Sequence, residues 1–261
     1  MSEPITTGWQ FWIDRGGTFT DVVARRPDGA IVTAKLLSEN PERYPDAAIQ
    51  GIRDVLSLDR DEPVTADAIE AVKMGTTVAT NALLERKGDR VLLAITRGFR
   101  DALRIGYQNR PKLFDRHIVL PELLYERVCE IDERIDAAGA TLAPLDEAAA
   151  RVAFADAHGA GIRAIAIVLM HGYRYPAHEE RLAALAAEIG FTQISVSHQV
   201  SPLMKLVSRG DTTVVDAYLS PILRRYVDAV AGALGDVRLM FMQSNGGLTN
   251  ARLFQGKDSI L

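Results

Sequence analysis

The sequence predicts an α/β fold that contains parallel strand pairs, and three observations support this prediction. From residue 71 onward, short apolar runs alternate with helical patterns, which is typical of strand–helix–strand units. Residues 9–37 instead hold three strand-like runs in quick succession, as in an antiparallel meander. The chain has 261 residues, of which 48% are hydrophobic and 25% charged, and this composition is ordinary for a globular protein.

The expected elements follow from apolar runs, turn signals and capping residues. Strands are expected at residues 9–13, 18–23, 30–37, 71–74, 91–95, 164–170, 193–196 and 237–242. A first helix should begin at Asn40 and Pro41 and bury Ala48, Ile49, Ile52, Val55 and Leu56. Further helices are expected at residues 78–86 before Gly88, 147–158 after Asp146, 178–188 before Gly190, and 221–234. Residues 106–145 are the least regular stretch and should cross the surface.

Charge and cysteine content narrow the class of protein. The formal net charge is -4 and the sequence pI about 5.8, which argues against a nucleic-acid partner. The single cysteine, Cys129, excludes an intrachain disulfide and is expected to be a packing or surface thiol rather than a nucleophile. No secretory signal is visible, and the longest apolar run, residues 164–170, is far shorter than the ~20 residues of a membrane helix. We therefore expect a soluble cytoplasmic protein without a membrane partner.

Residues 14–21 (DRGGTFTD), between the first two strands, are the most informative stretch. Adjacent glycines reach backbone angles closed to other residues and leave no Cβ to block a ligand, so successive N–H groups can face an anion. Thr18 and Thr20 would add hydroxyl donors, and Asp14 could hold Mg²⁺ through waters. A plain Gly-Gly hairpin turn is the alternative, but it does not account for two carboxylates and two threonines. The pattern therefore predicts phosphate binding.

Two further stretches place glycine and polar residues at the ends of strands. Residues 73–88 (KMGTTVATNALLERKG) put Gly75, Thr76 and Thr77 where a strand gives way to a helix, although either threonine could simply cap that helix. Residues 242–249 (MQSNGGLT) form a polar turn after the last strand, with an ordinary Asn-Gly turn as the alternative. Residues 211–213 (DTT) are expected to cap the helix that follows them, with an approach to the nucleotide cleft as the alternative.

The combination of motifs resembles a known family. Residues 14–21 resemble the first phosphate motif of the sugar kinase, heat-shock chaperone and actin ATPase superfamily. The three stretches, in this order and at these separations, are similar to the N-terminal part of the hydantoinase A/oxoprolinase family over essentially the whole chain. The ATP-dependent 5-oxoprolinases of that family are most closely resembled in four segments, residues 9–29, 106–128, 170–179 and 201–226.

The resemblance implies a fold, a reaction and cofactors. The fold would be an incomplete actin-like and sugar-kinase-like (ribonuclease H-like) ATPase fold with an α/β insertion. Residues 1–200 would form the hydantoinase/oxoprolinase N-terminal domain, and residues 201–261 the truncated beginning of the next domain. The reaction would open the lactam of 5-oxo-L-proline to L-glutamate, coupled to ATP hydrolysis with Mg²⁺. Hydantoin opening, carboxylation of a ketone and a non-catalytic fragment are the alternatives.

The resemblance also implies roles for single residues. Asp14 would be catalytic and organise the metal, and Arg15 would pair with a phosphate or with the substrate carboxylate. Residues expected to bind the nucleotide are Gly16, Gly17, Thr18, Thr20, Asp21, Gly75, Thr76, Thr77, Asn245, Gly246 and Gly247. Family members continue with a Ser-Gly-Pro-Ala-Gly-Gly stretch and a second Asp-x-Gly-Gly-Thr loop, which this sequence lacks. A hydantoinase B-like ring-opening part is expected in cis or in trans, and a homodimer is left open.

Overall fold

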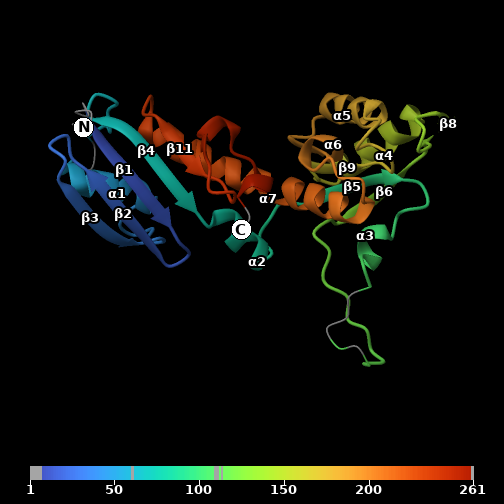
Figure 1. The fold of residues 1–261 in the computed structure, drawn as a ribbon, viewed down its shortest axis with the longest axis horizontal. Helices are drawn as coiled ribbons and strands as arrows, with labels where there is room; N and C mark the ends of the chain where they lie inside the picture. The colour runs from blue at the N-terminus through green and yellow to red at the C-terminus, as the bar shows by residue number, and fades with distance from the viewer. Residues whose placement is uncertain (1–7, 60–61, 109–111, 113, 260–261) are drawn as a thin grey trace. The chain divides into compact units, whose positions relative to one another are not determined.

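The computed structural model describes residues 8–59, 62–108, 112 and 114–259, and the chain forms two units (Figure 1). Unit 1 combines Met1–Lys87 with Ile222–Leu261, and unit 2 comprises Gly88–Pro221. Both units contain sheets and helices, which confirms the predicted α/β class. Within the described part of the chain, no helix combines the length and the apolar character needed to cross a bilayer.

Unit 1 is built on a six-stranded sheet in the order β12-β11-β4-β1-β2-β3. Its strands are β1 (Trp9–Arg15), β2 (Phe19–Arg25), β3 (Ile31–Leu37), β4 (Ile69–Thr76), β11 (Leu239–Met242) and β12 (Leu248–Asn250). The first three strands form the predicted antiparallel meander, while β4 runs parallel to β1 and β11 runs parallel to β4. The sheet is therefore mixed, with parallel and antiparallel strand pairs.

Alternation along β1 gives the sheet one buried face and one open face. Phe11 and Ile13 are buried, whereas Trp12 and Asp14 are exposed. The buried face is covered by helix α1 (Ala47–Leu56), which lies close to the sheet because a Cβ at Gly51 would lie only 2.6 Å from a methyl carbon of Val22. The open face is therefore the one that carries Asp14.

Helix α1 begins at Ala47 rather than at Asn40. Asp46 caps it by accepting the backbone N–H groups of Ala48 and Ile49 at 2.9 and 3.0 Å. A helix started at Pro41 would be interrupted, because Pro45 has no N–H to donate and disfavours helical angles at the preceding residue. Of the predicted buried face, Ala48, Ile49 and Ile52 are buried and Val55 and Leu56 are half-buried.

Unit 2 holds a four-stranded parallel sheet in the order β10-β9-β5-β6. Its strands are β5 (Val91–Thr96), β6 (Arg127–Ile131), β9 (Ala164–Val168) and β10 (Gln193–Val196), and a separate hairpin pairs β7 (Arg134–Ile135) with β8 (Thr141–Ala143). Strand β6 lies in the stretch predicted to be irregular. It was missed because it is a half-exposed edge strand in which charged residues interrupt the apolar pattern.

The helices of unit 2 follow the sequence more closely. They are α3 (Ala102–Ile105), α4 (Glu147–Gly159), α5 (Ala177–Ile189) and α6 (Ser197–Val200). As predicted, Asp146 caps α4, with its carboxylate accepting the N–H of Ala149 at 2.9 Å, and Gly190 ends α5 at a φ of 106°. Residues of α4 and α5, including Phe154 and Leu182, form one apolar core with Ile165 and Ile167 of β9.

Helix α7 (Leu206–Leu234) begins well before the predicted start at Pro221, which lies inside it. Residues 211–213 are therefore interior positions and not a cap. The hydroxyl of Thr213 donates to the carbonyl of Arg209 at 2.7 Å, as threonine does within a helix. Nearly every residue from 213 to 220 is buried, and the free energy gained from this packing can offset the hydrogen bond that Pro221 cannot make.

The remaining short helices are α2 (Val78–Leu84) and the 3₁₀ turns η1 (Ala251–Leu253) and η2 (Gly256–Asp258). Helix α2 ends two residues earlier than predicted, and the left-handed residue beyond it is Arg86, at a φ of 57°. Gly88, predicted to be the stop signal, is not left-handed. It is needed because a Cβ there would lie 2.2 Å from the ring of Tyr218.

Cys129 packs against the core of unit 2, and burial raises the pKa of its thiol to about 11. At pH 8 the reactive thiolate should therefore be about a hundredfold scarcer than for a thiol with the ordinary value of 9.0. We expect native protein to react with iodoacetamide about a hundred times more slowly than protein unfolded in urea. Mass spectrometry of quenched samples measures both rates, and comparable rates would contradict the packing role.

Candidate functional site

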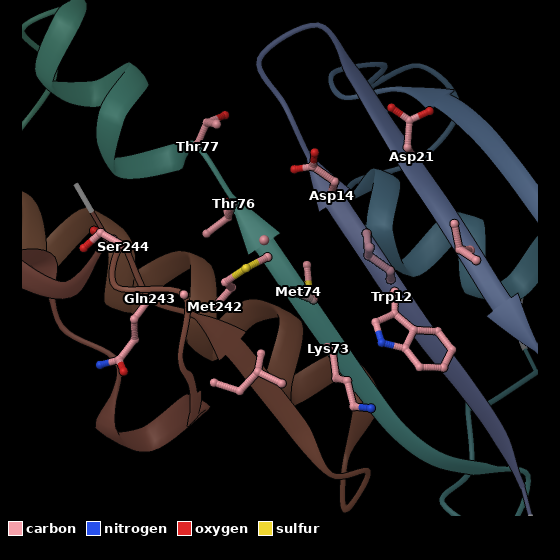
Figure 2. Close-up of a pocket in the computed structure, with 16 residues that line it drawn as sticks. Trp12, Asp14, Asp21, Lys73, Met74, Thr76, Thr77, Met242, Gln243 and Ser244 are labelled. Atoms are coloured by element: carbon pink, nitrogen blue, oxygen red, sulfur yellow. The ribbon is translucent and has the colours of Figure 1, made fainter. Parts of the chain in front are cut away.

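A pocket of about 650 Å³ lies on the open face of the unit 1 sheet (Figure 2). It is lined by residues of β1, β2 and β4, by the turn after β11, and by Leu248 and Ser259. Among the predicted site residues it brings together Asp14, Asp21, Gly75, Thr76, Thr77 and Gly246. Apolar side chains form the rest of its wall, among them Trp12, Val23, Met74, Met242 and Leu248. The pocket thus has a polar end beside the first hairpin and an apolar floor along the strands.

Asp14 is the carboxylate of this pocket that is free to take a cation. It lies directly opposite Asp21 in the β1–β2 register, so both side chains project from the same face. Asp21 is already paired, since the Lys35 ammonium donates to it at 2.6 Å. Among the described residues, the Asp14 side chain makes no hydrogen bond and no ion pair.

Gly75 leaves open space beside the Asp14 carboxylate. The two residues are partners in the β1–β4 register, and a Cβ at Gly75 would lie 3.4 Å from Asp14 Oδ1. Mg²⁺ commonly takes one or two carboxylates together with water and phosphate oxygens, so one free carboxylate facing open space suits it. No cluster of three or more His, Cys, Asp or Glu side chains able to hold a metal occurs in the described ranges. A single free carboxylate therefore suits a metal ion whose other ligands are mostly water and phosphate oxygens.

The two threonines tie the start of α2 to the first hairpin. Thr77 donates both its backbone N–H and its hydroxyl to the carbonyl of Arg15, at 3.1 and 3.2 Å. The hydroxyl of Thr76 accepts the N–H of Val78 at 3.2 Å, and this contact satisfies one amide of the first turn. Thr77 stands at the N-cap position but makes no side-chain capping bond. The threonines therefore hold the hairpin and α2 in one arrangement at the polar end of the pocket.

The glycines of the hairpin are required by close contacts rather than by unusual backbone angles. Neither Gly16 nor Gly17 adopts a left-handed φ, contrary to the conformational part of the prediction. A Cβ at Gly16 would lie 3.0 Å from the carbonyl oxygen of Phe19, which accepts the Gly16 N–H at 3.1 Å. A Cβ at Gly17 would lie 3.0 Å from the side-chain nitrogen of Asn81. A methyl group would be tight at both positions, so a neighbouring atom would have to move by a few tenths of an ångström to admit it.

Thr20 braces the hairpin from inside. Its side chain is fully buried, and its hydroxyl lies 3.0 Å from that of Ser38. The Ser38 hydroxyl in turn donates to the carbonyl of Gly16 at 2.7 Å. Thr20 therefore supports the loop and does not present its hydroxyl to a ligand, whereas Thr18 lies exposed at the tip.

Arg15, Gly17 and Thr18 line a second pocket, of about 610 Å³, rather than the pocket of Asp14. Neighbouring residues of a strand point to opposite faces, which separates Arg15 from Asp14. The Arg15 guanidinium lies over the ring of Tyr226, 5.0 Å from its centroid. Tyr226 lies some two hundred positions away in the sequence, so no local pattern could have connected it with Arg15.

The turn between β11 and β12 is closed by its own hydrogen bonds. Gln243 donates its N–H to the carbonyl of Gly247 at 2.8 Å, and Gly247 donates to the side chain of Asn245 at 2.8 Å. Gly246 has a φ of 82°. Of the three residues predicted to bind the nucleotide in this turn, Gly246 is the one that lines the Asp14 pocket. Asn245 and Gly247 lie exposed at the turn without lining that pocket.

Trp12 and Lys73 are pocket residues that the motif analysis missed. Lys73 places its ammonium 4.7 Å from the centroid of the Trp12 ring, a cation–π contact on the pocket floor (Figure 2). Trp12 could have been found from the alternation of β1, because it stands two residues before Asp14 on the same face. Lys73 faces Trp12 across the β1–β4 register, and this pairing is set by tertiary structure.

Comparison with known proteins places the fold and the site in a family. The model described as "Hydantoinase/oxoprolinase N-terminal region" matches residues 10–190, and the model described as "Hydantoinase/oxoprolinase" matches residues 209–261. The chain belongs to the hydantoinase/oxoprolinase family.

Relatives within the family point to a particular group. The chain is 41% identical to 5-oxoprolinase 1 of Arabidopsis thaliana and 40% identical to 5-oxoprolinase of Dictyostelium discoideum, each over 97% of its length. It spans only 22% and 23% of the length of those two relatives. The crystal structure of an ATP-dependent caprolactamase from Pseudomonas jessenii matches 96% of this chain and 38% of its own, with a TM-score of 0.81 and 32% identity.

Proposed function

We propose that this chain is the ATP-binding N-terminal part of a 5-oxoprolinase, which hydrolyses 5-oxo-L-proline to L-glutamate at the expense of ATP. The observation that supports the proposal most directly is the free Asp14 carboxylate beside a glycine hairpin, in a chain about 40% identical to 5-oxoprolinases over nearly its whole length. The caprolactamase, described as ATP-dependent, supports the use of ATP in this family.

The chemistry needs a phosphorylated lactam. An amide carbonyl reacts poorly with water, and transfer of the γ-phosphoryl group to the lactam oxygen makes the adjacent carbon electrophilic and supplies a leaving group. Water then attacks that carbon and the C–N bond of the ring breaks, with the nitrogen leaving as the amine, which gives an acyl phosphate. A second water hydrolyses the acyl phosphate to the carboxylate and inorganic phosphate. Bound Mg²⁺ would neutralise charge on the phosphates during the transfer. In this chain Asp14 would hold the Mg²⁺, and the backbone N–H groups of Gly17 and Thr18 would face the phosphates, since that of Gly16 is bonded to Phe19 within the hairpin.

Substrate identity and partners belong to the same proposal. A hydantoinase B-like part, in cis or in trans, would complete the ring opening. The similarity to a caprolactamase favours one second candidate, the opening of another cyclic amide. Measuring ATP hydrolysis with 5-oxoproline, caprolactam and hydantoin, and with acetone and bicarbonate, separates these reactions. We expect 5-oxoproline to give the largest stimulation.

The ATP-binding proposal is tested by exchanging the two carboxylates of the pocket in turn. Asp14→Asn should weaken binding of ATP in Mg²⁺ by tenfold or more, because it removes the free carboxylate of the site. Asp21→Asn is the matched control and should change binding less than threefold, because Lys35 already neutralises Asp21. Isothermal titration calorimetry measures both, with a parallel titration in EDTA. Equal affinities of wild-type protein and Asp14→Asn in Mg²⁺ would overturn the metal role.

A further inference from the structure

The second pocket contains Arg15, whose guanidinium has no hydrogen-bond partner in the described part of the chain. Arg15 has a side chain that is only 16% exposed, yet its guanidinium makes no hydrogen bond among the described residues. Its Nε is fully buried, and the nearest carboxylate oxygen, on Asp46, is 4.0 Å away. Leaving such a group unpaired costs free energy, so a partner that accepts these hydrogen bonds would be favoured.

Arg209 shows what a structural arginine looks like in the same chain. It is completely buried, and its five N–H groups all have acceptors, namely the Ser197 hydroxyl and the backbone carbonyls of Leu203, Met204, Leu169 and Met170. Arg15 has none of these acceptors. Arg209 thus completes a hydrogen-bond network, whereas the Arg15 guanidinium hydrogen-bonds to none of the described residues.

Arg15 is also held in place. Its guanidinium lies over one face of the Tyr226 ring, and that ring packs edge-on against Phe241 with centroids 6.5 Å apart. Phe241 is itself fully buried and stacked on Phe254 at 5.0 Å. A planar donor group positioned in this way binds oxyanions with little loss of conformational entropy.

The wall of the pocket carries one more cation than carboxylates, and Asp46 lies 4.0 Å from the Nε of Arg15. The cations of the wall are Arg15, Lys87 and Arg225, and its carboxylates are Glu39 and Glu85. Lys87 is paired with Glu85 at 2.5 Å, so these two charges largely cancel. The exposed Thr18 and the side chain of Asn81 add polar groups beside Arg15.

We propose that Arg15 is the receptor for an oxyanion in the pocket lined by Gly17, Thr18 and Asn81, and that Tyr226 positions its guanidinium. The proposal rests on the proposed function for the source of the oxyanion, which is either a phosphate group of ATP or the carboxylate of 5-oxoproline. Both sources offer two coplanar oxygens to the guanidinium, and the experiment distinguishes them.

The test uses the 261-residue chain in EDTA, without nucleotide, so that it does not depend on Mg²⁺ or ATP binding. The ligands are inorganic phosphate, 5-oxo-L-proline and 2-pyrrolidinone, which has the same ring without the carboxylate. Each is titrated calorimetrically into wild-type protein, Arg15→Gln, Arg15→Lys and Arg116→Gln, the last removing an exposed arginine of unit 2. Nitrogen-15 NMR follows the side-chain Nε signal of Arg15, assigned by its loss in Arg15→Gln.

We expect Arg15→Gln to weaken binding of one oxyanion tenfold or more, Arg15→Lys to weaken it less, and Arg116→Gln to leave it unchanged. A loss confined to 5-oxoproline, with 2-pyrrolidinone insensitive to Arg15, identifies the carboxylate, and a loss confined to phosphate identifies the nucleotide.

The role of Tyr226 is tested in the same titrations. Tyr226→Phe should keep the affinity, and Tyr226→Leu should lower it. Unchanged affinities in folded Arg15→Gln, or no binding to wild-type protein, would overturn the proposal. Oxyanion binding without binding of ATP in Mg²⁺ would instead refute only the proposed function.

Discussion

Replacing Arg209 by methionine is expected to lower the free energy of unfolding by about 3–5 kcal/mol, the range for removing one member of a buried charged network. Arg209 donates to carbonyls at the ends of both β9 and the segment before α7, so it joins parts of unit 2 that are far apart in the sequence. Through Ser197 it also reaches the buried carboxylate of Glu179.

The expected loss of stability is large because the groups that hydrogen-bond to Arg209 remain buried without it. Glu179 is fully buried and accepts hydrogen bonds from Leu169, Ser197 and His198, each at 3.1 Å or less. Without Arg209, the carbonyls that it served lose their donors, and Glu179 loses the nearby positive charge. Arg209→Lys should recover only part of the stability, since an ammonium has three donors where the guanidinium has five.

Urea unfolding followed by circular dichroism measures this prediction. Arg116→Met is the matched control, because Arg116 is exposed, and its midpoint should move by less than the equivalent of about 0.5 kcal/mol. If Arg209→Met unfolded at the same urea concentration as wild-type protein, the network would not be a stabilising feature of unit 2.

Replacing Gly88 by alanine should cost about 1–3 kcal/mol, the usual range for overpacking. The added methyl carbon would lie 2.2–2.5 Å from three ring atoms of Tyr218, which is 93% buried and cannot swing away freely. The φ of Gly88 is not left-handed, so the cost would come from this contact and not from backbone strain.

Gly159→Ala provides the control for the same change elsewhere. Gly159 ends helix α4, and a Cβ there would meet nothing within 4 Å. Alanine favours helix over glycine by up to about 1 kcal/mol, so this variant should be as stable as wild-type protein or slightly more stable. The thermal midpoint of Gly88→Ala should therefore fall, while that of Gly159→Ala should stay the same or rise slightly. A Gly88→Ala variant with an unchanged midpoint would show that the Tyr218 ring yields easily.

The elements that the sequence predicted well have local signals. Helix α4 begins directly after Asp146 and α5 ends directly before Gly190, because capping depends on a few neighbouring residues. The three-strand meander and its glycine hairpin were predicted from alternation and turn residues alone. The pairing of Asp14 with Asp21 across that hairpin follows from its length.

The elements that were wrong depend on distant contacts. Strand β6 pairs with β5 from an edge, and its charged residues hide it from a pattern search. Helix α7 runs through Pro221 while most of the residues just before it are buried. The local sequence suggests that Gly88 ends a helix. In the structure a side chain at this position would collide with the ring of Tyr218, which lies 130 positions later.

The same division holds for the candidate site. By itself, the sequence determined the α/β class, the glycine hairpin with its acidic residues and the resemblance to one family, because these are properties of short stretches and their order. Only the tertiary structure decided that Asp14 and Arg15 serve different pockets, that Thr20 is buried, and that Tyr226 lies under Arg15. Adjacent side chains of a strand point to opposite faces of the sheet. The residues that each of them contacts there come from chain segments far away in the sequence.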